Sequence, residues 1–240
     1  MSDGSLSPLV YPAGIMPGFN PLHPALKGVS HGFGFSAVVS ATGIVDVLSG
    51  LPGVVTGTPA FGIDSHIGPC LNFSTTGMHI NFSGKSITRN RFFTFAAMIR
   101  PTTITGYRAY FHTSSANDGL WFGLINGPVG GSAPGLADAP GAFSLVASVP
   151  YFCCASFDTN TATINTIAVD LRTGKITSGT ATQAAFNPSA PSGTYRVGLD
   201  AAATSSAVAK IAAVSFAPTF LTIPELLKCS NDPWSIWYPK

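Results

Sequence analysis

Short apolar runs with a period of two residues fill the chain from residue 28 to residue 218, and glycine or proline interrupts them throughout. The chain has 240 residues, of which 26 are Gly and 19 are Pro. These two residue types interrupt helices, so the composition excludes a helical bundle. Period-two alternation buries one face of a strand. We therefore predict an all-β fold in which antiparallel strands form a two-sheet sandwich.

Three runs show the alternation most clearly. Residues 78–82 place Met, Ile and Phe on one face, residues 93–99 place Phe, Phe, Ala and Ile there, and residues 195–199 place Tyr, Val and Leu there. We expect these faces to form the core between the two sheets. Cys153 and Cys154 are adjacent, so on a strand they point to opposite faces and cannot easily pair with each other.

The two ends of the chain depart from the strand pattern. Residues 1–27 contain five prolines and predict an extended Pro-rich arm, which leaves residues 28–240 as the sandwich domain. The sequence Thr222-Ile223-Pro224-Glu225 has the capping-box pattern, in which the Glu side chain reaches back to the helix start. It predicts one short helix over residues 222–229, followed by an aromatic C-terminal tail.

Acidic residues are scarce, because the chain has nine Asp and a single Glu, Glu225. Glycoside hydrolysis is the first chemistry to test on a β-sandwich, and it needs two facing carboxylates. No two acidic residues lie within five positions of each other, and Glu225 is assigned to the helix cap. We therefore predict a non-enzymatic protein without catalytic residues.

Two other kinds of site have weak sequence patterns. Residues 28–32, Gly-Val-Ser-His-Gly, match the spacing of a nucleophile elbow, but a strand-like run follows where that motif needs a helix. Asp64, His66, Cys70 and His79 form a local group of possible zinc ligands, without the close pairs typical of zinc sites. We predict neither a metal site nor a cofactor.

Charge and hydropathy limit the possible partners. The net charge is +2 and Lys and Arg are scattered, so we expect no nucleic-acid partner. Gly and Pro break the longest uncharged windows, so we expect no membrane span. The first 27 residues show no readable export signal, so we expect the four cysteines to be thiols. Charged residues make up 9% of the chain, a composition that suits a surface covered by neighbours.

Sugar binding needs a flat aromatic ring with planar polar groups beside it. Two consecutive strand-like runs and the turn between them supply both, and could present them on one face. The candidate glycan-binding residues are Tyr107, Tyr110, His112, Asn117, Trp121 and Asn126. The alternative is that these aromatic residues belong to the core or to a protein interface.

Apolar residues near both ends are candidate contacts with a partner, because they are costly to leave in water. They are Leu9, Tyr11, Ile15, Met16 and Phe19 in the arm, and Trp237 and Tyr238 in the tail. The alternatives are a disordered arm and a tail that folds back onto its own sheet.

Several short motifs follow one another in an order typical of one known superfamily. They are residues 68–73 with 78–80, residues 93–101, 151–158, 195–198 and 211–227, and the sequence Asn231-Asp232-Pro233-Trp234. Their order resembles the concanavalin A-like lectin/glucanase superfamily, in its laminin-G-like jelly-roll branch. The resemblance implies a jelly-roll sandwich over residues 28–240. Ala212 and Ala213 replace the acidic pair of the closing strand, so no catalytic or calcium motif is implied.

The sequence at residues 19–24, Phe-Asn-Pro-Leu-His-Pro, and the Asn-Asp-Pro-Trp ending resemble versions found in tailed-phage proteins. This resemblance implies a virion protein made in the host cytoplasm. We expect a capsid decoration or cement protein that binds the major capsid protein or other virion proteins as a homotrimer or homodimer. The alternative is a carbohydrate-binding, lectin-like module, for example in a tail or host-adsorption component.

Overall fold

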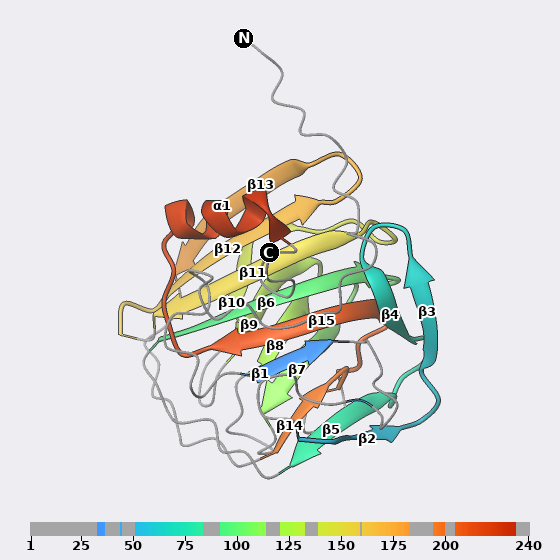
Figure 1. The fold of residues 1–240 in the computed structure, drawn as a ribbon. Coiled ribbons are helices and arrows are strands. Elements are labelled where there is room, and N and C mark those ends of the chain that lie inside the picture. The colour runs from blue at the N-terminus through green and yellow to red at the C-terminus, as the bar shows by residue number, and fades with distance from the viewer. Residues whose placement is uncertain are drawn as a thin grey trace.

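The computed structural model describes residues 33–36, 44, 51–83, 92–113, 121–132, 139–158, 160–182, 194–199 and 205–233. Within these residues two antiparallel β-sheets pack face to face, with one short helix on the outside (Figure 1). The period-two runs predict this all-β sandwich, and the prediction is confirmed. The residues assigned to the Pro-rich arm, together with Trp237 and Tyr238, lie outside the described residues.

The first sheet has eight strands in the described part of the chain. Seven follow one path, in the order β13 (Lys175–Thr182), β12 (Thr163–Asp170), β11 (Tyr151–Asp158), β6 (Phe92–Pro101), β15 (Ala209–Ala217), β4 (Gly68–Phe73) and β3 (Ala60–Asp64). The eighth strand, β1 (Phe33–Ser36), pairs with β15 beside this path. The long strand β15 therefore pairs with β4 through its first residues and with β1 through its later ones.

The second sheet has seven strands among the described residues. Their order is β10 (Ala139–Ser144), β9 (Pro128–Ser132), β8 (Trp121–Ile125), β7 (Tyr107–Thr113), β14 (Thr194–Val197), β5 (His79–Ser83) and β2 (Gly53–Thr56). Neighbours such as β7 and β14 are far apart in the sequence, so long connections cross between the sheets, as they do in a jelly roll.

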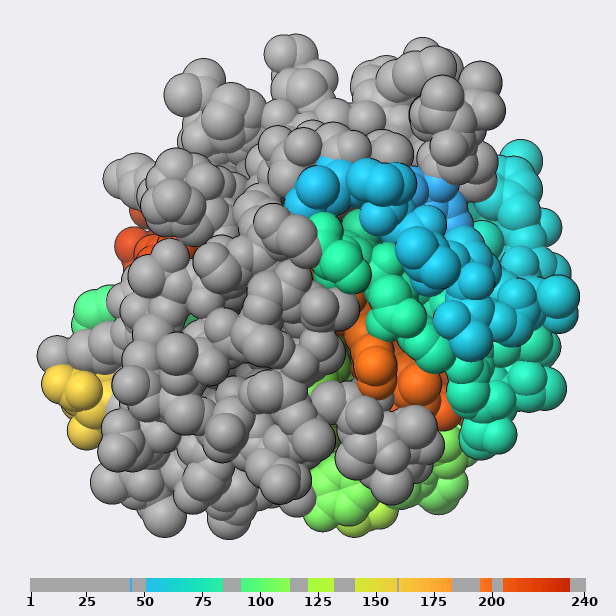
Figure 2. All heavy atoms as spheres, turned by 90° about the horizontal axis from the view of Figure 1, so that it is seen from below, coloured from blue at the N-terminus to red at the C-terminus, as the bar shows by residue number. Residues whose placement is uncertain are grey.

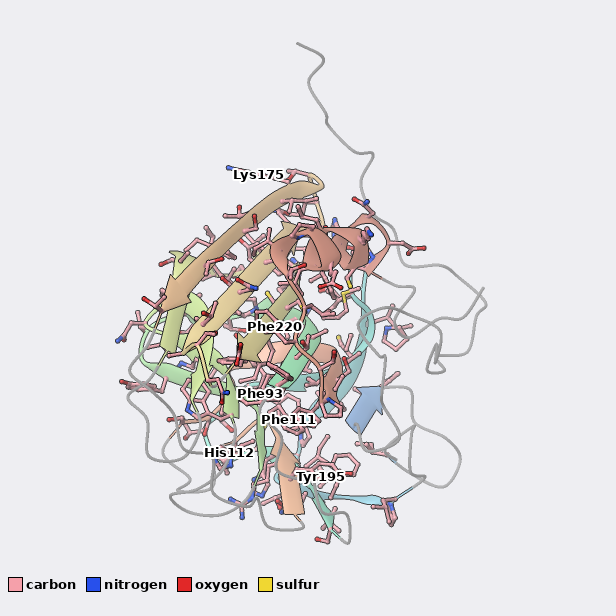
Figure 3. All side chains as sticks on the ribbon, turned by 90° about the vertical axis from the view of Figure 1, so that its left-hand side faces the viewer. Phe93, Phe111, His112, Lys175, Tyr195 and Phe220 are labelled. Carbon is pink, nitrogen blue, oxygen red and sulfur yellow. The ribbon has the colours of Figure 1, made fainter. Side chains whose placement is uncertain are left out.

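Aromatic rings fill the space between the sheets. Phe95 of β6 stacks on Phe122 of β8 with ring centroids 5.3 Å apart, and Phe111 of β7 stacks on Phe216 of β15 at 6.0 Å. All four side chains are at most 1% exposed. Figure 3 labels Phe111 together with Tyr195, whose rings also stack, at 6.0 Å. Each such pair adds about 0.5–1.5 kcal/mol beyond the burial of its area, so this layer joins the sheets.

A second apolar cluster lies on the outer face of the eight-stranded sheet, under helix α1 (Ile223–Asn231) (Figure 1). Phe152 and Cys154 of β11 belong to this cluster together with Cys229 of the helix. Cys153 belongs to the core between the sheets, so the two adjacent cysteines point to opposite faces, as their position on a strand predicts. All four cysteines are buried and free.

The predicted capping box marks the start of α1. The Glu225 carboxylate accepts hydrogen bonds from the Thr222 N–H and from the Thr222 hydroxyl, both at 2.8 Å. The helix continues to Asn231, two residues beyond the predicted end at residue 229. In the described residues, no helix has the length and apolar character needed to cross a membrane.

Buried polar side chains hold the segment before α1 against the sheet. Thr94, Ser156 and Asn165 lie side by side on β6, β11 and β12. The Leu221 N–H donates to the Ser156 hydroxyl at 2.7 Å, and the Asn165 amide donates to the Leu221 carbonyl at 3.1 Å. Because buried backbone groups need hydrogen-bond partners, this polar row determines where the helix sits.

Glycines close one lateral edge of the sandwich, where β10 of one sheet packs against β13 of the other. A Cβ placed on Gly179 of β13 would overlap the Cβ of Ala142 on β10, and a Cβ on Gly141 of β10 would overlap the Thr166 side chain on β12 of the other sheet. Close packing of the two sheets at this edge therefore requires glycine at both positions.

The closed edge makes a prediction about stability. We expect Gly179→Ala to lower the free energy of unfolding by about 1–3 kcal/mol, the usual cost of overpacking a filled interior. Urea unfolding followed by circular dichroism measures this loss. Gly62→Ala is the matched control, because a Cβ there has no heavy atom within 4 Å. Equal stability of the two variants would show that the sheets do not meet at this edge.

Candidate functional site

The predicted glycan-binding residues fall on β7, on β8 and on the turn after β8. Across the two strands, Trp121 pairs with His112 and Tyr107 pairs with Ile125. The rings of Tyr107 and Trp121 meet edge to face, with centroids 6.1 Å apart. Register and ring contact therefore bring Tyr107 and Trp121 together on the face that points away from the core. Asn117 lies outside the described residues.

A β-bulge at Tyr110 decides which side chains share that outer face. The register shifts between Ala109 and Phe111, so Tyr110 is the extra residue on β7. The Tyr110 and Phe111 side chains both belong to the core, and His112 returns to the outer face opposite Trp121. The prediction that Tyr110 contacts a glycan is therefore wrong, because its side chain is inside the sandwich and 1% exposed. Burial also raises the pKa of its hydroxyl well above the usual value.

The other predicted glycan-binding residues differ in how much of each side chain is exposed to solvent. Tyr107 is 42% exposed and Asn126 is exposed, whereas His112 and Trp121 are buried, at 6% and 9%. Solvent therefore reaches the ring of Tyr107 and the amide of Asn126, while the buried ring of Trp121 packs against Tyr107 on the outer face.

Two hydrogen bonds between Gly106 and Asn126 hold the Asn126 side chain at the start of β7. The Gly106 N–H donates to Asn126 Oδ1 and the Asn126 N–H donates to the Gly106 carbonyl, both at 3.0 Å. The φ angles are 72° at Gly106 and 53° at Asn126. This left-handed conformation is easiest for Gly and comparatively accessible to Asn. Oδ1 accepts the backbone bond, and Nδ2 is the donor atom of this exposed amide.

Arg108 adds a cation at the same place, outside the predicted set. Its Nε donates to the Thr105 carbonyl at 2.8 Å and its Nη1 to the Ser206 carbonyl at 3.4 Å. Its Nη2 lies 3.9 Å from the position of a Cβ on Gly106. We call this group the Gly106 corner, and it consists of Thr105, Gly106, Tyr107, Arg108 and Asn126. It contains an exposed aromatic ring, an amide and a guanidinium. Because Tyr107 and Arg108 are adjacent on β7 and pair with Ile125 and Leu124, the ring and the guanidinium leave the strand on opposite faces.

A polar row on the same sheet becomes visible only in the strand register. Trp121, His112, Arg196 and Asn81 lie side by side across β8, β7, β14 and β5. Arg196 Nε donates to Asn81 Oδ1 at 2.8 Å, and Asn81 Nδ2 lies 3.0 Å from His79 Nε2. The alternation of the sequence predicts that each of these residues lies on the strand face that points away from the core. It does not predict which of them are neighbours across the sheet. Sequence reasoning therefore missed Arg196 and Asn81.

The group considered for zinc is organised around a different interaction. Asp64 Oδ1 accepts from Arg100 Nη2 at 2.8 Å and Oδ2 accepts from Lys210 Nζ at 3.2 Å. In the part of the chain that the structure describes, no three His, Cys, Asp or Glu side chains are placed to hold a metal ion. Burial raises the pKa of Asp64, but hydrogen bonds from Arg100, the His66 backbone and Lys210 outweigh it and lower the pKa from 3.8 to about 2.

Comparison with known proteins gives fold neighbours and no family. No protein-family model and no curated protein sequence matches the chain. The binding domain of botulinum neurotoxin serotype D matches with 10% identity and a TM-score of 0.59, over 84% of this chain and 50% of that chain. Domain 4 of AbnA, a GH43 extracellular arabinanase from Geobacillus stearothermophilus, matches with 13% identity and a TM-score of 0.53, over 77% and 91%. A GH54 α-L-arabinofuranosidase matches with 11% identity and a TM-score of 0.55, over 81% and 50%.

These likenesses show the fold alone, a jelly-roll β-sandwich. This chain spans about half the length of the neurotoxin binding domain that it matches. None of these three neighbours is named as a virion component, so the virion role implied by the resemblance stays a prediction.

The ion pairs of Asp64 make a prediction about pH. Because its pKa is lower in the folded chain than in the unfolded chain, Asp64 stabilises the fold above about pH 4. This stabilisation is lost as the pH falls through about 2. Between these two pH values we expect wild type to lose roughly 2 kcal/mol more stability than Asp64→Asn. Urea unfolding across this range measures the difference, and the same pH dependence in both proteins would contradict the ion pairs.

Proposed function

We propose that the chain is a non-enzymatic glycan-binding domain and that the Gly106 corner contacts the sugar. The observation that carries this proposal is the ring of Tyr107, which is 42% exposed and rests edge to face against the buried Trp121. A ring that is fixed by a second ring and open to solvent offers a flat apolar face, on which a pyranose or furanose ring can stack.

The polar groups of the corner support binding without hydrolysis. Asn126 Nδ2 is a donor that matches the hydroxyl and ring oxygens of a sugar. Arg108 follows Tyr107 on β7, so its guanidinium lies on the opposite face of the strand from the stacking ring. The paired hydrogen bonds between Gly106 and Asn126 hold the Asn126 amide in place before a ligand arrives, which lowers the entropy cost of binding. The corner contains no carboxylate, and a glycosidase needs two.

The choice of ligand class is supported by two fold neighbours. The arabinanase domain is described in complex with arabinotriose, and the neurotoxin D structure is described as a receptor-binding domain. Because binding residues sit on loops that vary over a shared scaffold, the sandwich supports binding in general and the corner must supply specificity. Short neutral oligosaccharides, with arabinotriose first, are therefore the appropriate probes.

Titration calorimetry with arabinotriose and a panel of other oligosaccharides tests the glycan site. Loss of the stacking ring in Tyr107→Ala is expected to weaken binding at least about tenfold, equivalent to 1.4 kcal/mol. Asn126→Gly keeps the left-handed turn and removes only the amide, so it should weaken binding with the fold intact.

Phe61→Ala is the matched control for Tyr107→Ala, because Phe61 is 55% exposed on β3, in the other sheet. It should bind sugar as wild type does. The glycan proposal fails if no sugar of the panel binds at millimolar concentration, or if Tyr107→Ala binds as tightly as wild type.

A second candidate function, a capsid decoration protein located in the virion, rests on the exposed apolar surface. Val54, Val55, Phe61 and Ile63 are 41–79% exposed on a chain of which 9% is charged. Such a surface suits a protein held between neighbours in an assembly. Contacts with the major capsid protein would then come from the arm and the tail.

Sedimentation of phage particles tests this second candidate. Deleting residues 1–26 should release the protein from the particles, because the apolar arm residues would no longer anchor it. The circular dichroism spectrum should still show a folded sandwich. Truncated protein that stays on the particles at full occupancy would contradict anchoring by the arm.

A further inference from the structure

The end strands of both sheets, β2 and β3, lie at the lateral edge opposite the one that glycine closes, and we call them the β2–β3 flank (Figure 1). Figure 2 shows these residues as a continuous blue to cyan strip at the surface of the molecule. Ile63 is 79% exposed and Phe61 is 55% exposed on β3, and Val54 is 65% exposed on β2. The flank is therefore an exposed apolar surface built on strand edges.

In the part of the chain that the structure describes, the flank lacks the protection that edge strands usually carry. Charged side chains, proline or a covering element normally keep such edges from pairing. Residues 60–63 contain no charge and no proline, and Asp64 at the end of β3 is held by Arg100 and Lys210. At the other end of the same sheet, β13 begins with the exposed Lys175 and packs against β10 (Figure 3). Among the described residues, β10 thus covers one edge of this sheet and no strand pairs with the outer edge of β3.

We propose that β3 pairs antiparallel with β3 of a second copy of the chain, about a two-fold axis at Gly62. This pairing sets Phe61 opposite Ile63 of the second copy, so that two Phe and two Ile side chains meet on one face. Cross-strand pairs of this kind contribute about 0.2–1 kcal/mol each. No heavy atom lies within 4 Å of a Cβ placed on Gly62, so the opposite face of the strand is open at the axis.

Charge favours a second copy over a charged partner. Residues 51–63 carry no charged side chain, so two copies meet without repulsion, while an acidic or basic partner finds no opposite charge there. Pairing also satisfies the N–H and C=O groups on the open side of β3. A typical stable interface buries about 1,200–2,000 Å², and a tight dimer needs an interface of about that size. A pair of five-residue strands buries less. We therefore expect a dimer that dissociates on dilution.

Analytical ultracentrifugation of the full chain, at concentrations around the micromolar range, tests the dimer. Wild type is expected to dimerise as its concentration rises. The double variant Phe61→Thr, Ile63→Thr should raise the dissociation constant at least about tenfold, since Thr keeps the β propensity of the strand and removes the apolar contact. The control Leu227→Thr changes an apolar residue on α1 that is 36% exposed, and it should dimerise as wild type does.

Thermal unfolding of the double variant checks that it is folded. A wild type that is monomeric at every concentration would overturn the proposal, as would a folded double variant that dimerises as strongly as wild type. Sugar titration of both proteins keeps this test separate from the glycan site, because the Gly106 corner lies on other strands.

Gly62→Cys tests the register of the pairing. In the proposed dimer the two introduced thiols stand opposite each other, with Cα atoms about 4.5–5.5 Å apart, a separation that a disulfide bridges. The four native cysteines are buried and should not interfere. Mild oxidation should link Gly62→Cys into a covalent dimer and leave Leu227→Cys monomeric. No link in Gly62→Cys, under conditions where wild type dimerises, would overturn the two-fold axis at Gly62.

Discussion

The stacked aromatic layer between the sheets is the interaction on which the rest of the structure depends. Phe95 with Phe122 and Phe111 with Phe216 join strands that are distant in the sequence, and each pair joins one sheet to the other. Because these rings are buried at the centre, they orient β6 and β15 against β7 and β8. Each strand then has one face committed to the core, and its other face is available for a helix, a site or a partner.

The β-bulge at Tyr110 connects this packing to the proposed binding site. Without the bulge, strict alternation would place His112 on the core side with Tyr110. The extra residue lets both Tyr110 and Phe111 enter the core and brings His112 opposite Trp121 on the outer face. Trp121 in turn supports Tyr107, the exposed ring of the Gly106 corner. A local backbone irregularity therefore shapes the surface where a ligand would bind, as bulges near functional sites often do.

The end strands of the two sheets are treated differently at the two lateral edges of the sandwich. At one edge, Gly179 of β13 packs against Ala142 of β10 with no room for a side chain, and the sandwich closes. At the other edge, Phe61 and Ile63 stay exposed on a strand without charge or proline. Scarce charge, which weakens the case for a hydrolase at the sequence level, also leaves the β2–β3 flank without the usual protection against pairing.

Local sequence patterns determined the strand faces and the helix cap of this protein. The alternation around Phe93 and Phe95, the opposite faces of Cys153 and Cys154, and the cap of Glu225 on Thr222 depend on residues near each other in the chain, so the sequence predicts them. The neighbours of each strand depend on the register between distant segments. Only the tertiary structure therefore placed Arg196 beside Asn81 and Arg100 beside Asp64. Only the shifted register put both Tyr110 and Phe111 in the core and His112 opposite Trp121. Periodicity identifies the buried face of a strand, whereas pairing and bulges decide which side chains meet.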